Sequence, residues 1–353
     1  MQRILLAAAV LALHTHVVAD EPPTRYQLVA PKDDGIVATD LNDRGDLIGF
    51  EWVEEKNLPG VVSQVPFYAK GKNLIVLPLL TGYTATHPAA VSETGLVVGR
   101  ASKAAPPGQR VYLRNQAFVW DEAGGIRGLG ALKDDSASLA CGVAGDGTCI
   151  SGLSIGDNRV RACVWERDGL IWKATPLPQT AQLGSQVVVI SDNGRYVASV
   201  DGAVPCLWSR EKGDAWTREV IGDAGSLAPR AVNNSGVVVG LSLTLDGLSD
   251  AVIWTRGVGP KRLEKPKGFV RSEAYAINND GVVVGMVDGP RGSTIGPNAF
   301  VYQNGRLRLI DECGPSFQSA TAINDHGQVS GVLEKEEEAG EDSRGPSRPK
   351  API

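Results

Sequence analysis

The stretch Ser272–Gly285, SEAYAINNDGVVVG, decides the fold. An apolar segment leads into an Asn- and Asp-rich turn that ends at Gly281, and a run of valines follows. Asn and Asp hydrogen-bond to their own backbone and tolerate left-handed φ, and Gly adopts positive φ at no steric cost. The pattern therefore predicts a hairpin of two antiparallel strands.

Variants of this hairpin recur six more times along the chain. Their turn glycines follow one another at intervals of about 42 to 52 residues. Such a period is typical of one blade of a β-propeller. The other copies are ATDLNDRGDLIG (Gly45), AAVSETGLVVG (Gly95), CGVAGDGTCISG (Gly147), VVISDNGRYVAS (Gly194), AVNNSGVVVG (Gly236) and AINDHGQVSG (Gly327).

A short apolar and aromatic motif follows every hairpin except the last and predicts a third strand. A turn and a fourth strand come next, as in GRLRLI (305–310), so each repeat predicts one four-stranded antiparallel blade. The motifs are PFYA (66–69), AFVW (117–120), ACVW (162–165), PCLW (205–208), AVIW (251–254) and AFVY (299–302). The expected fold is all-β, a β-propeller of seven blades. Six or eight blades and a stacked β solenoid are the alternatives.

The last repeat is incomplete, because the chain after Gly331 turns acidic within a few residues. Tyr26–Pro31, YQLVAP, resembles a fourth strand and could complete the final blade. Otherwise the final blade is short by a strand, and periodicity leaves both outcomes open. The tryptophans that end the third-strand motifs are expected to pack between blades.

Insertions in the repeat are confined to the connection between the second and third strands. Because strand direction alternates, these connections lie on one face of the ring and the Asn-Gly turns on the opposite face. Variable loops on a rigid scaffold are a common place for binding sites. Trp52, Arg110, Tyr112 and Arg114 in the first two inserted loops are the candidate partner-binding residues. The alternative is that these loops are solvated and simply tolerate insertion.

The hairpins with their third strands, AINNDGVVVG with AFVY and AVNNSGVVVG with AVIW, resemble the HAF-type extracellular repeats of secreted bacterial proteins. The resemblance extends over about residues 25–333 and is strongest over 228–331. It implies a secreted, propeller-like repeat protein. It implies no activity and no catalytic residue, because the motif residues are turn and core positions.

The ends of the chain read differently from the repeats. Residues 1–19 have a short basic start with Arg3, an apolar core over 5–13 and a small-residue end before Asp20. These features predict a secretory signal peptide, with a buried strand or helix as the alternative. The repeats then form one domain over 20–333, and 334–353 is predicted to be a disordered, acidic, proline-containing tail. Export places the protein in the periplasm or outside the cell.

Five cysteines are present, and an exported chain permits disulfides. Cys141 and Cys149 flank the third hairpin turn and could form a bridge across it. The alternative is that the cysteines are small core residues, which suits Cys163 and Cys206 at the Phe position of the third-strand motif.

The composition argues against several classes of function. The net charge of −5 gives no electrostatic case for nucleic acid, and the apolar segment over 5–13 is too short to span a bilayer. Beyond the predicted signal peptide only His87 and His326 remain, on opposite faces, so no zinc site and no histidine-dependent catalytic set is expected. No cofactor motif is present. Carboxylate pairs suited to glycoside chemistry cannot be recognised from sequence alone.

These observations favour an exported binding or scaffold module for a protein or polysaccharide partner, acting through its variable loops, over an enzyme. One alternative is a secreted polysaccharide-active hydrolase or lyase with its site in the propeller channel, which would need polar side chains converging there. Another is a structural envelope protein without a ligand. The oligomeric state is not encoded in these patterns.

Overall fold

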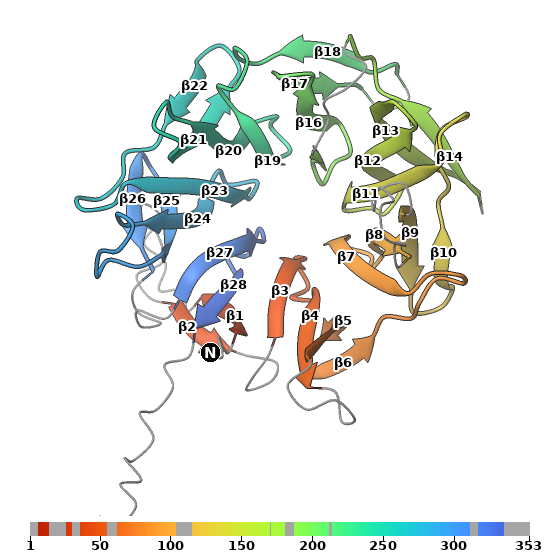
Figure 1. Ribbon diagram of the computed structural model, residues 1–353, viewed down its shortest axis with the longest axis horizontal. Coiled ribbons are helices and arrows are strands. Elements are labelled where there is room, and N and C mark those ends of the chain that lie inside the picture. Colours follow the sequence, from red (N-terminus) through yellow and green to blue (C-terminus); the bar gives the residue numbers. More distant parts are fainter. Residues whose placement is uncertain are drawn as a thin grey trace, which may run out of the picture.

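The computed structural model describes residues 6–13, 26–29, 36–54, 62–103, 115–169, 171–180, 187–211, 214–310 and 317–334. Every regular element of this described part is a β-strand. The strands form antiparallel four-stranded sheets arranged around a central axis, as Figure 1 shows. The prediction of an all-β propeller is confirmed.

Six blades are each built from four consecutive strands of one continuous stretch of chain. Their strands are β3 (Ile36–Leu41), β4 (Leu47–Glu54), β5 (Val62–Lys70) and β6 (Asn73–Val76); β7 (Ala85–Val91), β8 (Val97–Ser102), β9 (Asn115–Asp121) and β10 (Gly125–Gly128); β11 (Ala137–Val143), β12 (Cys149–Gly156), β13 (Arg159–Asp168) and β14 (Ile171–Pro176); β15 (Val188–Ile190), β16 (Tyr196–Asp201), β17 (Val204–Ser209) and β18 (Thr217–Val220); β19 (Ala228–Val232), β20 (Val238–Leu243), β21 (Ser249–Thr255) and β22 (Gly259–Arg262); and β23 (Arg271–Ile277), β24 (Val283–Asp288), β25 (Asn298–Gln303) and β26 (Arg306–Leu309).

A further four-stranded sheet combines both ends of the chain in the order β2-β1-β28-β27. The last repeat supplies β27 (Phe317–Ile323) and β28 (Val329–Glu334), and the N-terminal region supplies β1 (Leu6–Leu13) and β2 (Tyr26–Val29). The prediction of seven equivalent blades is therefore corrected to six, the number given as an alternative, because the last repeat contributes only two strands to this composite sheet. YQLV takes the fourth place as expected, whereas the third place is taken by residues of the predicted signal peptide.

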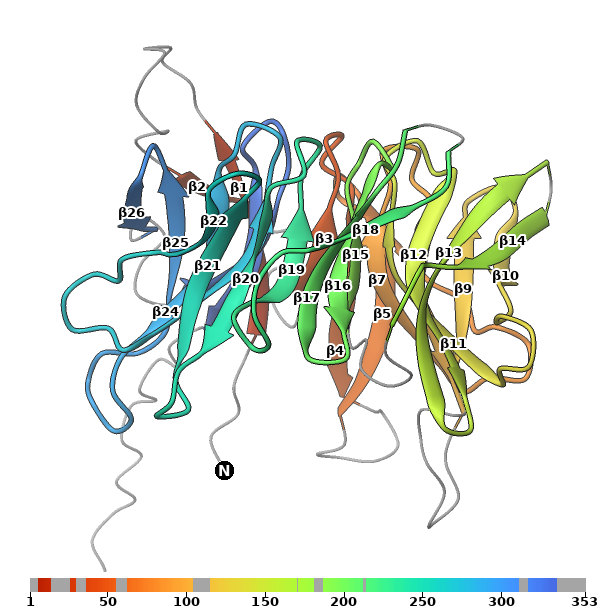
Figure 2. The same ribbon diagram turned by 90° about the horizontal axis from the view of Figure 1, so that it is seen from above.

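Within each blade the first strand lies nearest the axis and the fourth strand lies at the rim (Figure 1). Strand direction places the turns after first strands on one side of the ring, the turn face, and the connections after second strands on the other, the loop face (Figure 2). No helix in the described residues is both long and apolar enough to cross a bilayer.

The cores lie between neighbouring blades, and the tryptophans of the third strands fill them. Trp165 and Trp208 are fully buried. Trp208 packs in one cluster with Val164 of the preceding blade, and Trp254 packs with Leu207 in the same way. The prediction that these tryptophans pack between blades is confirmed.

The Asn-x-x-Gly turn is built by its asparagine and its glycine. Gly281 has a φ of 80° and donates its N–H to the carbonyl of Asn278 at 3.1 Å. The Asn278 side chain, 5% exposed, accepts the N–H of Val282 at 2.9 Å. Its amide Nδ2 donates to the carbonyl of Asn324, in the next turn around the ring, at 3.1 Å. One buried side chain thus closes its own turn and binds the neighbouring blade.

The same bond repeats around the ring wherever the turn begins with asparagine. Asn233 donates to the Asn278 carbonyl at 3.1 Å, Asn324 to the Asn42 carbonyl at 3.0 Å, and Asn42 to the Ser92 carbonyl at 2.9 Å. The bond from Asn324 to Asn42 joins the last repeat to the first. The ring is therefore closed at its turns independently of the N-terminal strands.

The residue after each of these asparagines makes a second link to the next turn. The N–H of Asn234 donates to the side chain of Asn279, that of Asn279 to Asp325, and that of Asp325 to Asp43, at 2.7 to 2.8 Å. The remaining links connect Asp43 to Glu93, Glu93 to Gly145, Gly145 to Asp192 and Asn193 to Asn234. We call this closed set of hydrogen bonds between turns the turn belt.

Substitution of Asn278 tests the turn belt. Asn278→Ala removes both bonds, leaves the Val282 N–H without a partner and leaves the Asn324 carbonyl with only the Gly327 N–H, so we expect a loss of about 2–3 kcal/mol in the free energy of unfolding. Asn278→Ser should cost less, because serine at the equivalent position 92 still accepts the N–H of Leu96 at 3.0 Å. Urea denaturation measures both, with the exposed Asp280→Ala as a control in the same turn. Equal stabilities for the alanine variant and the control would contradict the assignment.

Candidate functional site

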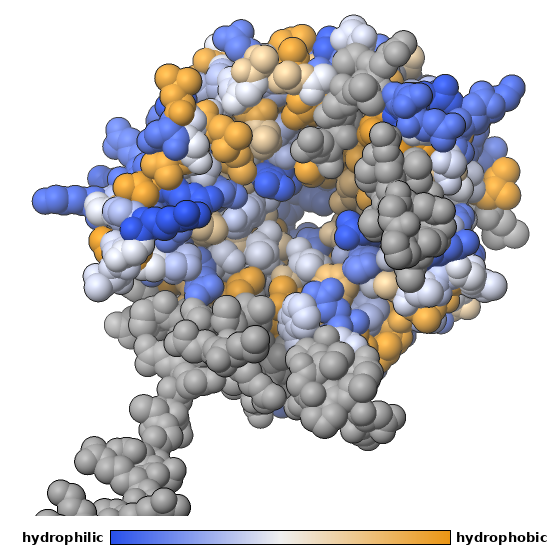
Figure 3. All heavy atoms as spheres, viewed as in Figure 1, coloured by the Kyte–Doolittle hydropathy of each residue, from blue (hydrophilic) through white to orange (hydrophobic). Residues whose placement is uncertain are grey.

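The first strands enclose a channel along the axis of the ring, and its opening is visible in Figure 3. Toward the turn face the channel holds a cavity of about 230 Å³. All first strands contribute to its lining, including β3, β7, β11, β15, β19, β23 and β27. The small residues Ala90, Gly142 and Ala276 leave this space open.

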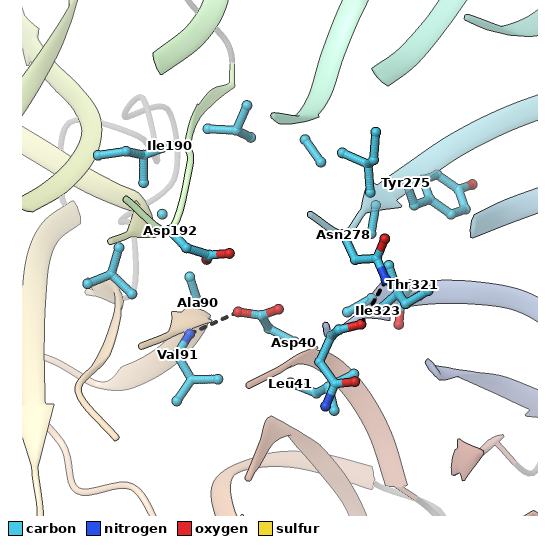
Figure 4. A pocket seen from close by; sticks show the side chains of 18 of the residues that line it. Asp40, Leu41, Ala90, Val91, Ile190, Asp192, Tyr275, Asn278, Thr321 and Ile323 are labelled. Atoms are coloured by element: carbon cyan, nitrogen blue, oxygen red, sulfur yellow. Dashed lines mark hydrogen bonds between the residues drawn. The ribbon is translucent and has the colours of Figure 1, made fainter. Parts of the chain in front are cut away.

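Five carboxylates, from three blades and the composite sheet, line the cavity, Asp43 and Asp325 among them. Asp40 stands near the end of β3, Glu93 lies in the turn after β7, and Asp192 lies in the turn after β15. In Figure 4 the side chains of Asp40 and Asp192 point into the opening from different sides. Asp40 accepts the N–H of Val91 at 2.9 Å, which ties the first blade to the second. The cavity therefore brings together acids that are far apart in the sequence.

The surroundings of these acids favour their protonated forms. Burial raises the pKa of Asp40 to about 7, opposed by the Val91 N–H, and the charges of Asp192 and Glu93 raise it further. The pKa of Glu93 is raised by burial and by the Asp43 and Asp192 charges. Burial also raises the pKa of Asp192, although Asn279 donates to its carboxylate at 3.2 Å. Asp40, with a pKa of about 7, therefore changes charge near neutral pH, and the pKa values of Glu93 and Asp192 are raised above their ordinary values.

The cavity also contains Tyr275 and Arg230. In Figure 4 the Tyr275 ring is directed away from Asp40 and Asp192, and its hydroxyl donates to Glu273 at 3.2 Å. Among the described residues, no group of three or more His, Cys, Asp or Glu side chains has an arrangement that could hold a metal ion. The groups available for chemistry in the channel are its carboxyl groups, Tyr275, Arg230 and Cys141.

Sequence reasoning did not find these acids. In the sequence, Asp40, Glu93 and Asp192 are distinguished only as residues within the hairpin repeats. The sequence feature that could have pointed to acids in the channel is a carboxylate at or just beyond the end of a first strand. It could be used only once the first strand was known to be the innermost one, which the repeat period does not reveal.

Of the predicted binding residues, Trp52 belongs to the described part of the chain and lies on the loop face. Trp52 is 38% exposed near the end of β4, beside the equally exposed Val53. Arg110, Tyr112 and Arg114 lie outside the described residues. Other apolar side chains on the loop face are also exposed, namely Leu243 at the end of β20, Leu245 beyond it and Ile295 between β24 and β25.

Two hollows open on the same face, each between a connection that follows a second strand and a crossover to the next blade. One, of about 650 Å³, is lined by Asp157–Arg159 and Pro176–Leu177, with Arg161 and Gln179. The other, of about 540 Å³, is lined by Ala224–Ser226 and Ser242–Asp246, with Arg262. The loop face therefore carries both cavities and exposed apolar groups.

A buried carboxylate organises the larger hollow. Asp135 accepts hydrogen bonds from Ser154, Arg159 and Arg161 at 2.6 to 3.1 Å. Burial acts to raise its pKa, but these donors outweigh burial and lower it. Both arginines remain partly exposed, with 40% and 28% of their side chains accessible. They are held in place by Asp135 and still present N–H groups to solvent.

The predicted bridge between Cys141 and Cys149 is not formed, and both thiols are free. The hairpin register explains why. Ala144 donates its N–H to the Cys149 carbonyl, and Cys141 lies in a bulge between Ala140 and Gly142. The two cysteines are therefore not cross-strand partners. Burial raises the pKa of Cys141 to about 11 and that of Cys149 to about 12.

Two of the other cysteines are small core residues, as the alternative interpretation predicted. Cys163 and Cys206 are free and fully buried in the cores between blades, which confirms that they are small core residues. Cys313 lies outside the described residues.

Comparison with known proteins finds similar solved structures but no matching family. No protein-family model and no curated protein matches the sequence. Similar solved structures include a putative TolB from Agrobacterium tumefaciens, with 12% identity, coverage of 95% of this chain and 100% of that chain, and a TM-score of 0.47. The β-propeller domain of the Trilobed protease from Pyrococcus furiosus is 12% identical over 72% of this chain and 79% of that chain, with a TM-score of 0.48. AofleA from Arthrobotrys oligospora is 13% identical over 78% and 86%, with a TM-score of 0.44.

The raised pKa of Asp40 predicts how stability depends on pH. The folded protein binds a proton at Asp40 up to about pH 7, whereas the unfolded chain releases it near the ordinary value of 3.8. This group therefore makes the fold less stable as pH rises from about 4 to 7, with no further change above. Asp40→Asn keeps an oxygen that can accept the Val91 N–H but has no carboxyl group to ionise. The change in the free energy of unfolding caused by this substitution should therefore be more favourable at pH 8 than at pH 5, by about 1–2 kcal/mol.

Urea denaturation at both pH values measures this difference, with Asp280→Asn on the exposed side of a turn as the control. The same effect of Asp40→Asn at pH 5 and pH 8 would show that Asp40 is ionised in the folded protein at both.

Proposed function

We propose that the protein is an exported binding module that takes up a protein or polysaccharide partner on its loop face. The observation that carries the proposal is the coincidence of two hollows with the exposed side chains of Trp52, Leu243 and Leu245 on that face. Exposed aromatic and apolar groups beside polar hollows are the usual composition of recognition surfaces.

The proposal includes the finer features of the chain. It takes residues 1–19 as a signal peptide, 20–333 as a ring of seven HAF-like repeats with an incomplete last blade, and 334–353 as a tail. The periplasm or the extracellular space is the proposed location. The Asn-x-x-Gly hairpins followed by A-F-V-W motifs support the HAF resemblance, and the apolar core over 5–13 supports export.

A glycan and peptide array tests the loop face. The full chain is compared with a variant carrying Trp52→Ala, Leu243→Ser and Leu245→Ser, and with a second variant carrying Arg110→Ala, Tyr112→Ala and Arg114→Ala. We expect binding to fall about tenfold or more in at least the first variant, because removal of one anchor residue commonly costs more than about 1 kcal/mol. Circular dichroism checks that the fold is kept.

The matched control is Val258→Ser, which removes an apolar side chain of 78% exposure from the turn after β21, on the turn face. It should bind as the unmodified protein does. Retained binding in both loop-face variants would place the partner elsewhere.

A second candidate function is supported by the channel acids. A polysaccharide-active hydrolase or lyase needs polar side chains that converge in the channel, and Asp40, Glu93 and Asp192 do so. A carboxyl group with a pKa of about 7 is suited to general acid or base catalysis at neutral pH.

Turnover measurements with polysaccharide substrates test this candidate. Asp40→Asn should lower kcat by about 100-fold or more, because general acid or base catalysis contributes about that much. Asp280→Asn, an exposed acid in a turn of the same face, is the control. Turnover that is unchanged in Asp40→Asn would contradict a catalytic role for the channel acids.

A further inference from the structure

The third strand of the composite sheet comes from a segment that export would remove. Leu6–Leu13 forms β1, which pairs antiparallel with β28 from Leu6↔Glu334 to Leu11↔Val329. The same residues fall within the apolar core predicted for a signal peptide. If the chain is processed after Ala19, as proposed above, β28 loses the partner along its outer edge. An unpaired strand edge is a template for another extended chain.

The remaining N-terminal strand is poorly suited to fill the vacated place. β2 is antiparallel to β1, and β1 is antiparallel to β28, so β2 runs parallel to β28. Third strands in the other blades run antiparallel to their second strands, as β25 does to β24. Residues 26–29 would have to reverse direction to restore that pairing, although only the six residues 30–35 join them to β3.

The vacated place differs from other third-strand positions in one respect. In the sixth blade Gly285 pairs with Phe300, and a Cβ on Gly285 would lie 2.8 Å from the Phe300 ring. The third strand there supplies the ring that covers the glycine. The equivalent pairs in the first two blades are Gly49 with Phe67 and Gly99 with Phe118.

In the composite sheet this ring comes from the first strand instead. A Cβ on Gly331 would lie 2.7 Å from the ring of Phe317, which is 1% exposed and belongs to β27. The residue that pairs with Gly331 is Ala9. The space over the glycine is already filled, so the third strand needs a small residue at this position and has no room for phenylalanine.

We propose that the processed protein binds, along the outer edge of β28, an extended apolar segment of a partner protein. The segment runs antiparallel to β28 and carries a small residue opposite Gly331. Backbone hydrogen bonds to Val329–Leu333 supply affinity, as in other cases of strand addition to a sheet edge. The Phe317 ring supplies selectivity. This interaction surface is separate from the loop face and from the channel acids.

The test compares two forms of the whole protein, the unprocessed chain and the chain isolated after export, with N-termini identified by mass spectrometry. The probe is a fluorescent peptide containing LLAAAVLAL, residues 5–13, extended by lysines at both ends for solubility. We expect the processed form to bind the peptide and the unprocessed form not to. Hydrogen exchange of residues 329–334 should be fast in the free processed form and slow about tenfold or more with peptide.

Selectivity is tested with a peptide in which the residue corresponding to Ala9 is phenylalanine. It should bind about tenfold or more weakly, because overfilled sites cost about 1–3 kcal/mol. Phe317→Ala should narrow this difference by opening the space over Gly331. The peptide pair alone decides the point if Phe317→Ala does not fold.

Several results would overturn the proposal. One is slow hydrogen exchange of residues 329–334 in the free processed monomer, which would show that residues 26–29 pair with β28 instead. Another is a dimer of the processed protein that protects the same residues from exchange. Equal binding of the two peptides would show that Phe317 does not select for a small residue opposite Gly331. An exported chain that still begins at residue 1 would overturn processing as well, whereas failure on the loop-face array would leave this edge unaffected.

Discussion

The turn belt is the constraint on which the rest of the structure depends. Each blade buries its faces only against its neighbours, so the ring is stable only if every neighbour is present in the correct register. The belt fixes that register, because Asn278 and its equivalents close their own turn and reach the next turn with the same side chain. A buried amide that lost either bond would carry a desolvation penalty. The belt also includes the bond from Asn324 to Asn42, so the last repeat is held to the first.

This arrangement divides the molecule into a rigid face and a variable one. The turn face is occupied by the belt, and its side chains are committed to bonds between blades. Among the described residues of the loop face no such closed set of hydrogen bonds links one connection to the next, so loop length can change there without disturbing the register of the ring. The belt would thus fix the positions of the blades that carry the hollows at Arg159 and Leu243. The loop residues that line these hollows could still change without affecting the belt.

The features that could be predicted from the sequence are those that recur from repeat to repeat or resemble a repeat strand. The Asn-x-x-Gly motif gave the hairpins, the position of Trp165 and Trp208 gave the packing between blades, and YQLV was recognised as a fourth strand. What it could not give depended on proximity across the ring or on exact register. The meeting of Asp40 with Asp192 is one example, and the bulge that separates Cys141 from Cys149 is another. The strand formed by Leu6–Leu13 was hidden because the same apolar run also satisfies the pattern of a signal peptide.

The uneven makeup of the turn belt has a mechanical consequence. Between the last and first repeats, where the chain is not continuous, the belt has two bonds, from Asn324 and from Asp325. Between the second and third turns, and again between the third and fourth, the described belt has one backbone bond, from Glu93 to Gly145 and from Gly145 to Asp192, because Ser92 and Ala144 have no side-chain amide to donate. Under tension applied around the ring, the belt would part first at one of these two junctions between covalently joined repeats. The junction between the chain ends is therefore not the weakest point of its circumference.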